Sequence, residues 1–213
     1  MLVRLFLFLC LITIGIHKSY AKDDSDLSII TEYIQNLKSV EMDFIQRDSR
    51  GEEAKGKILL VKPYQFRCNY YAPYPLLVLG NKSEVVLYDY ALEQTTRIDR
   101  KDNLFNFLLA DEKEWKKNFR LENLTKESGR LLFKLYHYPT ERTISIILQQ
   151  KPLILTHIII DEPDGNIIEV KVDNILKISN VDKELFSLPN PDVFGIPKRL
   201  SKNEIEKTYD VMR

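Results

Sequence analysis

The chain is poor in the residues on which catalysis and metal binding usually depend. Its 213 residues include two cysteines, three histidines and seven glycines. So few glycines leave little room for phosphate-cradling loops, and no G-x-S-x-G nucleophile elbow occurs. His137 and His157 lie too far apart in the sequence to form a local metal motif. We therefore expect no enzyme, no metal and no other cofactor, and an envelope hydrolase is a weak alternative.

Excess charge of one sign is also absent, since 31 Lys and Arg face 31 Asp and Glu. A nucleic-acid partner needs a basic surface for its phosphates, so none is expected. Cys10 and Cys68 are the only cysteines. Cys68 follows Arg67, and a nearby cation can activate a thiol, but a buried structural cysteine is the favoured interpretation.

The N-terminus has the pattern of a secretory signal peptide over residues 1–21. Arg4 precedes an apolar run of roughly a dozen residues, and small residues at Ser19 and Ala21 mark a cleavage site. A membrane-spanning helix needs ~20 residues, so an uncleaved anchor is disfavoured. Lipid attachment at Cys10 is disfavoured because this thiol lies within the apolar run. Removal of the signal leaves Cys68 alone, and export without a disulfide indicates the periplasm of a bacterium.

The remaining chain predicts a mainly β (α+β) domain over residues 22–195, followed by a charged tail at 196–213 that is frayed or forms a short helix. Apolar residues at helical spacing predict a helix over 26–38, capped by Ser25 or Asp26. Alternating residues then predict a strand from Val40, and Asp164-Gly165 is a strong hairpin turn. Further strands are predicted at 57–62, 65–70, 76–80, 84–89, 94–98, 119–123, 130–137, 142–148, 153–161 and 166–177.

Several of these strands are apolar on both faces, which an antiparallel sheet with one face in water does not require. The runs are at 58–61, 76–79, 85–87, 146–148, 153–155 and 158–160. A strongly curved sheet closed by a few short helices, with an apolar cavity between them, accounts for such runs. A filled core accounts for them equally well. The apolar segment 104–109 has the same ambiguity, because it fits a core helix or a lid.

Four segments in order resemble the outer-membrane lipoprotein carrier (LolA) family. They are Ser39–Gln46 (SVEMDFIQ), Gly56–Arg67 (GKILLVKPYQFR), Tyr70–Pro73 with Leu76–Val78, and Val85–Gln94 (VVLYDYALEQ). The resemblance is good over residues 26–120 and mainly architectural over 120–190. It implies an incomplete, strongly curved antiparallel β-barrel of about eleven strands, with a lid of short helices enclosing an apolar cavity.

The resemblance also implies a function without covalent chemistry. Such carriers take acylated lipoproteins from an inner-membrane lipoprotein-releasing ABC transporter complex and deliver them to an outer-membrane acceptor. We expect a monomer in the periplasm. The cavity and lid residues implied are Phe44, Leu60, Phe66, Leu104, Phe105, Phe107 and Leu108.

In the family a basic side chain on the sheet, usually arginine, hydrogen-bonds backbone at the lid and holds the empty state closed. Lys62 stands at that position here, and lysine offers a point charge where arginine offers a planar fork of donors. Either the latch is therefore weaker, or the neighbouring Arg67 takes over its role. A solvated lysine at a strand end is the structural alternative for Lys62.

Two other functions can be compared with the pattern. The same fold can bind phospholipid or another amphiphile, or act as a sensor, because a fold does not determine its passenger. An acceptor anchored at the outer membrane would need a lipid-attachment cysteine after the signal peptide, and residues 22–26 contain none.

Overall fold

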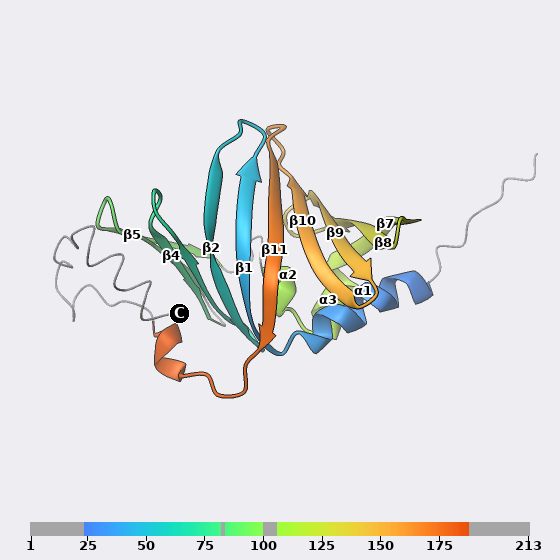
Figure 1. Cartoon of the computed structure of the whole chain (residues 1–213), viewed down its shortest axis with the longest axis horizontal. Coiled ribbons are helices and arrows are strands. Elements are labelled where there is room, and N and C mark those ends of the chain that lie inside the picture. Colours follow the sequence, from blue (N-terminus) through green and yellow to red (C-terminus); the bar gives the residue numbers. More distant parts are fainter. Residues whose placement is uncertain (1–23, 82–83, 100–105, 188–213) are drawn as a thin grey trace, which may run out of the picture.

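The computed structural model describes residues 24–81, 84–99 and 106–187. A single helix precedes a long series of strands, and two short helices interrupt that series in the middle (Figure 1). The elements are α1 (Asp24–Asn36), β1 (Ser39–Asp48), β2 (Glu53–Val61), β3 (Gln65–Tyr70), β4 (Leu76–Gly80), β5 (Glu84–Asp89), β6 (Gln94–Asp99), α2 (Asn106–Leu109), α3 (Glu112–Asn118), β7 (Phe119–Glu127), β8 (Arg130–His137), β9 (Arg142–Gln150), β10 (Leu153–Asp161), β11 (Ile167–Lys177) and the 3₁₀ helix η2 (Lys183–Phe186).

The eleven strands form one antiparallel sheet in the order β6-β5-β4-β3-β2-β1-β11-β10-β9-β8-β7. Among the described strands, the first and the last in sequence therefore pair at the centre, and a meander of neighbouring strands extends from each. The sheet is bent, so that β4 and β5 on one side and β7 to β9 on the other flank β1 and β11 (Figure 1). The sheet does not close, because β6 and β7 lie at its two ends. The predicted incomplete barrel of eleven strands is confirmed.

One face of the sheet, here called the inner face, carries Val40, Met42 and Phe44 of β1 and their cross-strand neighbours. These side chains join Ile30 and Ile34 of α1 in a core that also includes α2 and α3. Alternation puts every second strand residue on this face, and burial of its apolar area stabilises the curved sheet and its helical cover together.

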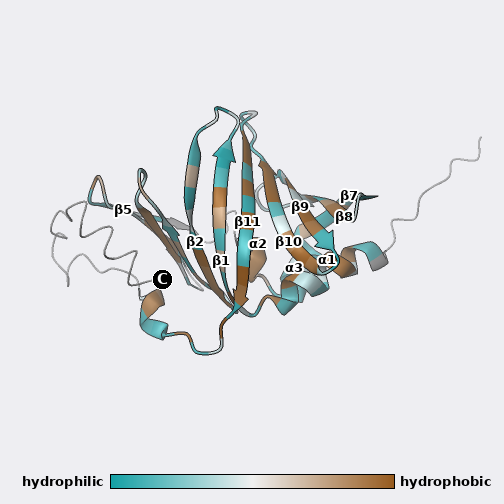
Figure 2. Cartoon of the chain, in the orientation of Figure 1, coloured by the Kyte–Doolittle hydropathy of each residue, from teal (hydrophilic) through white to brown (hydrophobic). Residues whose placement is uncertain are grey.

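The opposite, outer face explains why some strands are apolar on both sides. Leu77 and Leu79 of β4 and Tyr88 of β5 form a second buried cluster there, and β4 is hydrophobic along most of its length (Figure 2). The helix η2 contacts the neighbouring strand β3, and its Phe186 is only 6% exposed. A segment that follows the last described strand in sequence thus packs near the outer face of the sheet at β3.

Most predicted elements occur with small shifts in their bounds, but the cap of the first helix and the bounds of two strands were wrong, and one short helix was missed. The first helix begins at Asp24, so Ser25 and Asp26 lie within its first turn and do not precede it. Strand β2 begins at Glu53, before the expected start at 57, and β7 continues to Glu127. The 3₁₀ helix at Lys183–Phe186 was not predicted.

Two predicted boundary segments, the signal peptide at 1–21 and the tail at 196–213, lie outside the described residues, so they stay predictions. Among the residues that are described, no helix is both long and apolar enough to cross a membrane.

Candidate functional site

Five of the residues predicted to line a cavity or lid lie together in the core between the sheet and the helices. Phe44, Leu60 and Phe66 point from the inner face, and Phe107 and Leu108 from α2; none is more than 2% exposed. Leu104 and Phe105 lie outside the described residues. The walls proposed for a cavity are thus in mutual contact here, and apolar side chains occupy the space between them.

The lid candidate is the connection between β6 and β7, which are the two ends of the open sheet. Within it, Trp115 of α3 donates from Nε1 to the Phe107 carbonyl of α2 at 2.7 Å. The indole ring also stacks on Phe119, with 4.4 Å between ring centroids. Asp111 caps α3, and Glu114 completes a capping box, so the turn between α2 and α3 is well defined.

Lys62 joins this lid to both α1 and the sheet. It lies two residues after Leu60, and its Nζ donates to the Ile34 carbonyl of α1 at 2.8 Å and to the Ala110 carbonyl between α2 and α3 at 3.4 Å. Gln35 of α1 donates to the same Ala110 carbonyl at 3.0 Å. One ammonium therefore bridges the C-terminal turn of α1 and the lid, where the carbonyls of a helix end attract a cation.

Burial of this ammonium has an electrostatic cost. Desolvation lowers the pKa of Lys62 to about 8, and the nearby Asp111 carboxylate partly opposes the shift. Lys62 is only partly exposed, and its Nζ donates hydrogen bonds to backbone carbonyls. The alternative of a freely solvated lysine does not match this geometry.

Arg67 does not contact the lid. It precedes Cys68 and follows Phe66, which are both inner-face residues, so its side chain projects from the outer face. There its guanidinium donates to the Leu185 carbonyl of η2 at 3.0 Å. The expectation that Arg67 assists the latch at Lys62 is therefore corrected, because the two side chains are on opposite faces of the sheet.

The surroundings of the remaining titratable candidates, Cys68 and His137, fit structural roles. Burial raises the pKa of the Cys68 thiol, which disfavours a reactive thiolate. Burial lowers the pKa of His137 to about 4, and its ring stacks on Phe119 and contacts the Thr140 hydroxyl. Across the described residues, no group of three or more His, Cys, Asp or Glu side chains could hold a metal ion.

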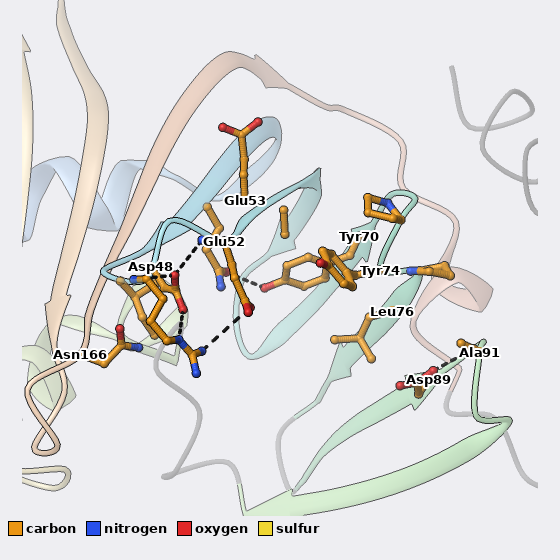
Figure 3. Close-up of a pocket in the computed structure, with 15 residues that line it drawn as sticks. Asp48, Glu52, Glu53, Tyr70, Tyr74, Leu76, Asp89, Ala91 and Asn166 are labelled. Carbon is orange, nitrogen blue, oxygen red and sulfur yellow. Dashed lines mark hydrogen bonds and ion pairs between the residues drawn. The ribbon is translucent and has the colours of Figure 1, made fainter.

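A groove of about 410 Å³ opens at the end of the inner face where the β1–β2 and β10–β11 turns lie. Inner-face residues continue into it from the core: Gln46, Ala54, Tyr70, Leu76 and Ile168. Figure 3 shows Glu52 and Asp89 on opposite sides of the groove, with Tyr70, Tyr74 and Leu76 between them. The groove therefore combines an apolar floor with a polar rim.

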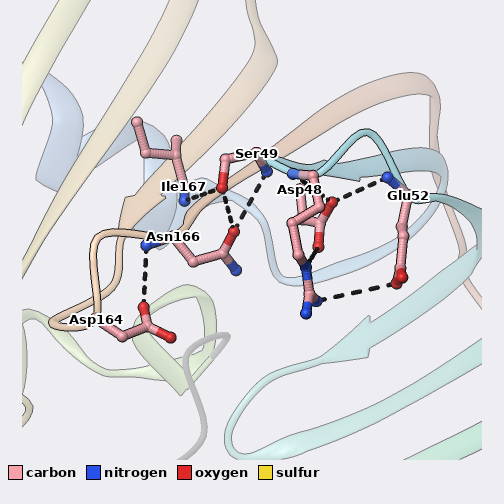
Figure 4. Close-up of polar contacts among 7 residues, drawn as sticks. Asp48, Ser49, Glu52, Asp164, Asn166 and Ile167 are labelled. Carbon is pink, nitrogen blue, oxygen red and sulfur yellow. Dashed lines mark hydrogen bonds and ion pairs between the residues drawn. The ribbon is translucent and has the colours of Figure 1, made fainter.

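The rim is held by a network between two turns that are distant in sequence (Figure 4). Asp48 accepts hydrogen bonds from the backbone amides of Arg50 and Glu52 and from the Arg50 guanidinium, which holds the pKa of its carboxyl low. Ser49 donates from Oγ to Asn166 Oδ1 at 2.5 Å, across 117 residues of sequence. These bonds pin the β1–β2 turn against the β10–β11 turn.

Sequence reasoning missed this groove, because its lining combines strand ends and turns of the β1–β6 meander with Asn166 and Ile168, which reach it only through the β1–β11 pairing. The Asp111–Glu114 capping box was also missed, although its spacing was visible in the sequence.

The comparisons with known proteins include the family that the segments quoted above resemble. A family model described as "Outer membrane lipoprotein carrier protein LolA" matches residues 35–189. An uncharacterized protein, RP864, of Rickettsia prowazekii is 40% identical over 207 residues, which cover 97% of both chains. An outer-membrane lipoprotein carrier protein of Chromobacterium violaceum is 28% identical over 109 residues, 48% of this chain and 53% of that protein.

Among solved structures, a LolA superfamily protein of Nitrosomonas europaea, NE2245, aligns with 76% of this chain and 97% of its own. Its TM-score is 0.48 and its sequence identity 10%.

Proposed function

Because the chain belongs to the outer membrane lipoprotein carrier (LolA) family, we propose that it is a periplasmic carrier that binds the acyl chains of lipoproteins between its sheet and its helical lid. Residues 1–21 serve as the export signal. The proteins that load and unload it are an inner-membrane lipoprotein-releasing ABC transporter complex and an outer-membrane acceptor. Such a carrier needs no covalent chemistry, in keeping with the residue inventory of the chain.

The observation that carries the proposal is the bridge from Lys62 to the carbonyls of Ile34 and Ala110. It holds a two-helix lid over an inner face made of large apolar side chains. Each acyl methylene moved out of water contributes about 0.8 kcal/mol, so a bound lipid chain would be held too tightly to be released. If the empty carrier is mostly closed, only the open fraction can bind, so the apparent affinity is reduced in proportion to that fraction. The weaker binding permits transfer of the lipoprotein to the next protein.

The test is binding of a fluorescent triacylated lipoprotein to the mature chain and its Lys62→Met variant. Loss of the two charge-assisted hydrogen bonds shifts the lid toward the open state, so we expect about tenfold tighter binding and slower release to acceptor vesicles. Lys134→Met removes an exposed lysine on β8 and serves as the matched control.

Unchanged affinity in Lys62→Met, with Lys134→Met as reference, would contradict the latch. Failure of the mature chain to bind any acylated protein would contradict the carrier. Tight binding of phospholipid in preference to lipoprotein would replace the proposal with the phospholipid-binding alternative.

A further inference from the structure

The groove at the open end of the inner face adjoins the apolar core that lies under the lid. In the register of the sheet, Phe44 lies opposite Gly56, and Gly56 lies opposite Tyr70. The rings of Phe44 and Tyr70 meet edge to face, with 5.0 Å between centroids. Phe44 belongs to the core, whereas Tyr70 lines the groove. This aromatic pair is therefore the boundary between the apolar core and the groove.

The groove differs from the core in its hydrogen-bonding groups. The Tyr70 hydroxyl donates to the Gln46 side chain at 3.0 Å, and Asn166 and Tyr74 also line the groove. Tyr74 is 57% exposed on the rim. Amide and hydroxyl groups beside an apolar floor suit a ligand that is part hydrocarbon and part peptide, and a volume of about 410 Å³ falls within the usual range of ligand pockets.

The charge of the groove is negative once its internal pairs are set aside. Asp48 is bound to Arg50, and Glu53 pairs with Arg47 at 2.8 Å and with Lys55 at 3.1 Å. Glu53 also points away from the groove (Figure 3). Two carboxylates then remain on opposite walls. The Glu52 carboxylate is 3.9 Å from the Arg50 guanidinium, which is already paired with Asp48. The Asp89 carboxylate accepts hydrogen bonds from the uncharged backbone amides of Ala91 and Leu92.

From this arrangement we infer that the groove holds the first peptide residues after the acylated residue of the passenger, and that it prefers a basic segment. The inference rests on the proposed function, because it takes the acyl chains to lie beyond the Phe44–Tyr70 pair. The carboxylates of Glu52 and Asp89 attract lysine or arginine in that segment. The same two carboxylates repel the phosphate of a phospholipid headgroup, so the groove also discriminates against phospholipid.

The experiment uses synthetic lipopeptides with identical acyl chains and three linkers, Ser-Lys-Lys-Asn, Ser-Gln-Gln-Asn and Ser-Glu-Glu-Asn. Their affinities for the mature chain are measured by competition with a fluorescent acyl probe at low and at high salt. We expect the Lys linker to bind about fivefold more tightly than the Glu linker at low salt, as partly exposed ion pairs allow, and the difference to shrink at high salt.

The variants separate this inference from the carrier function. Glu52→Lys alters an exposed rim residue and should abolish the preference for the Lys linker over the Glu linker. Asp89→Asn keeps the turn bonds and should reduce the preference by about half. Glu127→Lys makes the same charge change on an exposed residue of β7 and should leave the preference intact.

Equal binding of all three linkers to the wild-type chain would overturn the inference while leaving the carrier function standing. A preference for the Lys linker that survives in Glu52→Lys would also overturn the inference, because the linker charge would then be recognised at another part of the protein. Binding of none of the lipopeptides would instead overturn the carrier function on which the inference depends.

Discussion

Contacts of single residues set the shape of the inner face, and Gly80 is the sharpest case. A Cβ at this position would lie 1.8 Å from the Phe66 ring, and the three nearest atoms all belong to that ring. Phe66 itself is 2% exposed, so it has little space into which to move. The absence of a side chain at Gly80 therefore allows the Phe66 ring to lie against the backbone of β4.

This contact predicts a strong coupling between two substitutions. Gly80→Ala should lower the free energy of unfolding by about 1–3 kcal/mol through overpacking. Phe66→Leu should cost about 1–2 kcal/mol alone, and the double variant should be clearly more stable than the sum of the single effects indicates. Urea denaturation of the four proteins provides the measurement. Additive changes in the free energy of unfolding would mean that the cost of a methyl group at residue 80 does not depend on the Phe66 ring.

Lys62 predicts a pH dependence that an arginine at the same place would not give. Its pKa is about 8 in the folded chain and near its ordinary value of 10.5 when unfolded. Between these values the unfolded state binds more protons, so stability rises with pH. We expect the free energy of unfolding of the wild type to rise by about 1 kcal/mol relative to that of Lys62→Arg between pH 7.5 and pH 9.5, after allowing for partial solvent access. Parallel pH profiles in denaturant unfolding would contradict this.

At this scale the sequence was informative wherever alternation alone decides the direction of a side chain. Lys62 follows the inner-face row of Ile58 and Leu60, and it does face inward. The same alternation counted from Phe66 puts Arg67 outward, and its proposed role at the latch ignored this. What Arg67 contacts was not predictable, because η2 lies 118 residues further along the chain.

Among the elements, the lid is distinguished by carrying the only tryptophan of the chain. Trp115 is fully buried, hydrogen-bonded to α2 and stacked on Phe119. Movement of α2 away from the sheet must therefore change the surroundings of the indole ring. Its fluorescence is a direct reporter of the position of the lid.

We expect the Trp115 emission to shift to longer wavelength when an acylated ligand is added, because the lid moves and the indole gains contact with water. Lys62→Met without ligand should show part of the same shift. A control ligand with the same peptide but no acyl chain should have no effect. An emission spectrum that stays constant during saturating binding would show that the ligand enters without moving α3.

Elements with a strong period were predictable, whereas those defined by end chemistry or by distant contacts were not. The strands at 65–70, 76–80, 84–89, 130–137 and 153–161 have the predicted bounds. The helix η2 has four residues and no period of its own, and it is defined by the cap at Asp182 and by burial of Phe186. Local sequence contains little of that information.

For the whole molecule, the decisive feature is the seam where β1 pairs with β11. Each meander on either side forms from neighbouring strands, but the seam joins residues more than a hundred positions apart. Ser49 and Asn166 connect the two turns at one end of this seam. Non-local pairing of this kind is costly in chain entropy, so bonds across the seam contribute to the integrity of both halves.

Ser49→Ala and Asn166→Ala should each lower the free energy of unfolding by about 0.5–1 kcal/mol, and the double variant by little more than either one. The reason is that each substitution removes the bond from Ser49 Oγ to Asn166 Oδ1. Hydrogen exchange at β1 and β11 should increase near the turns in all three proteins. Faster exchange confined to β4 and β5 would instead place the weak point outside the seam.

The two free ends of the sheet, β6 and β7, give the molecule a mechanical property that a closed barrel lacks. A closed barrel has a circumference set by its strand number, and widening it requires hydrogen bonds between strands to break. An open sheet can flatten slightly along its whole width while every described strand pair keeps its register. Under the proposed carrier function, release of the lid, which joins those two ends along the chain, would let the curvature relax and make room for passengers with different numbers of acyl chains.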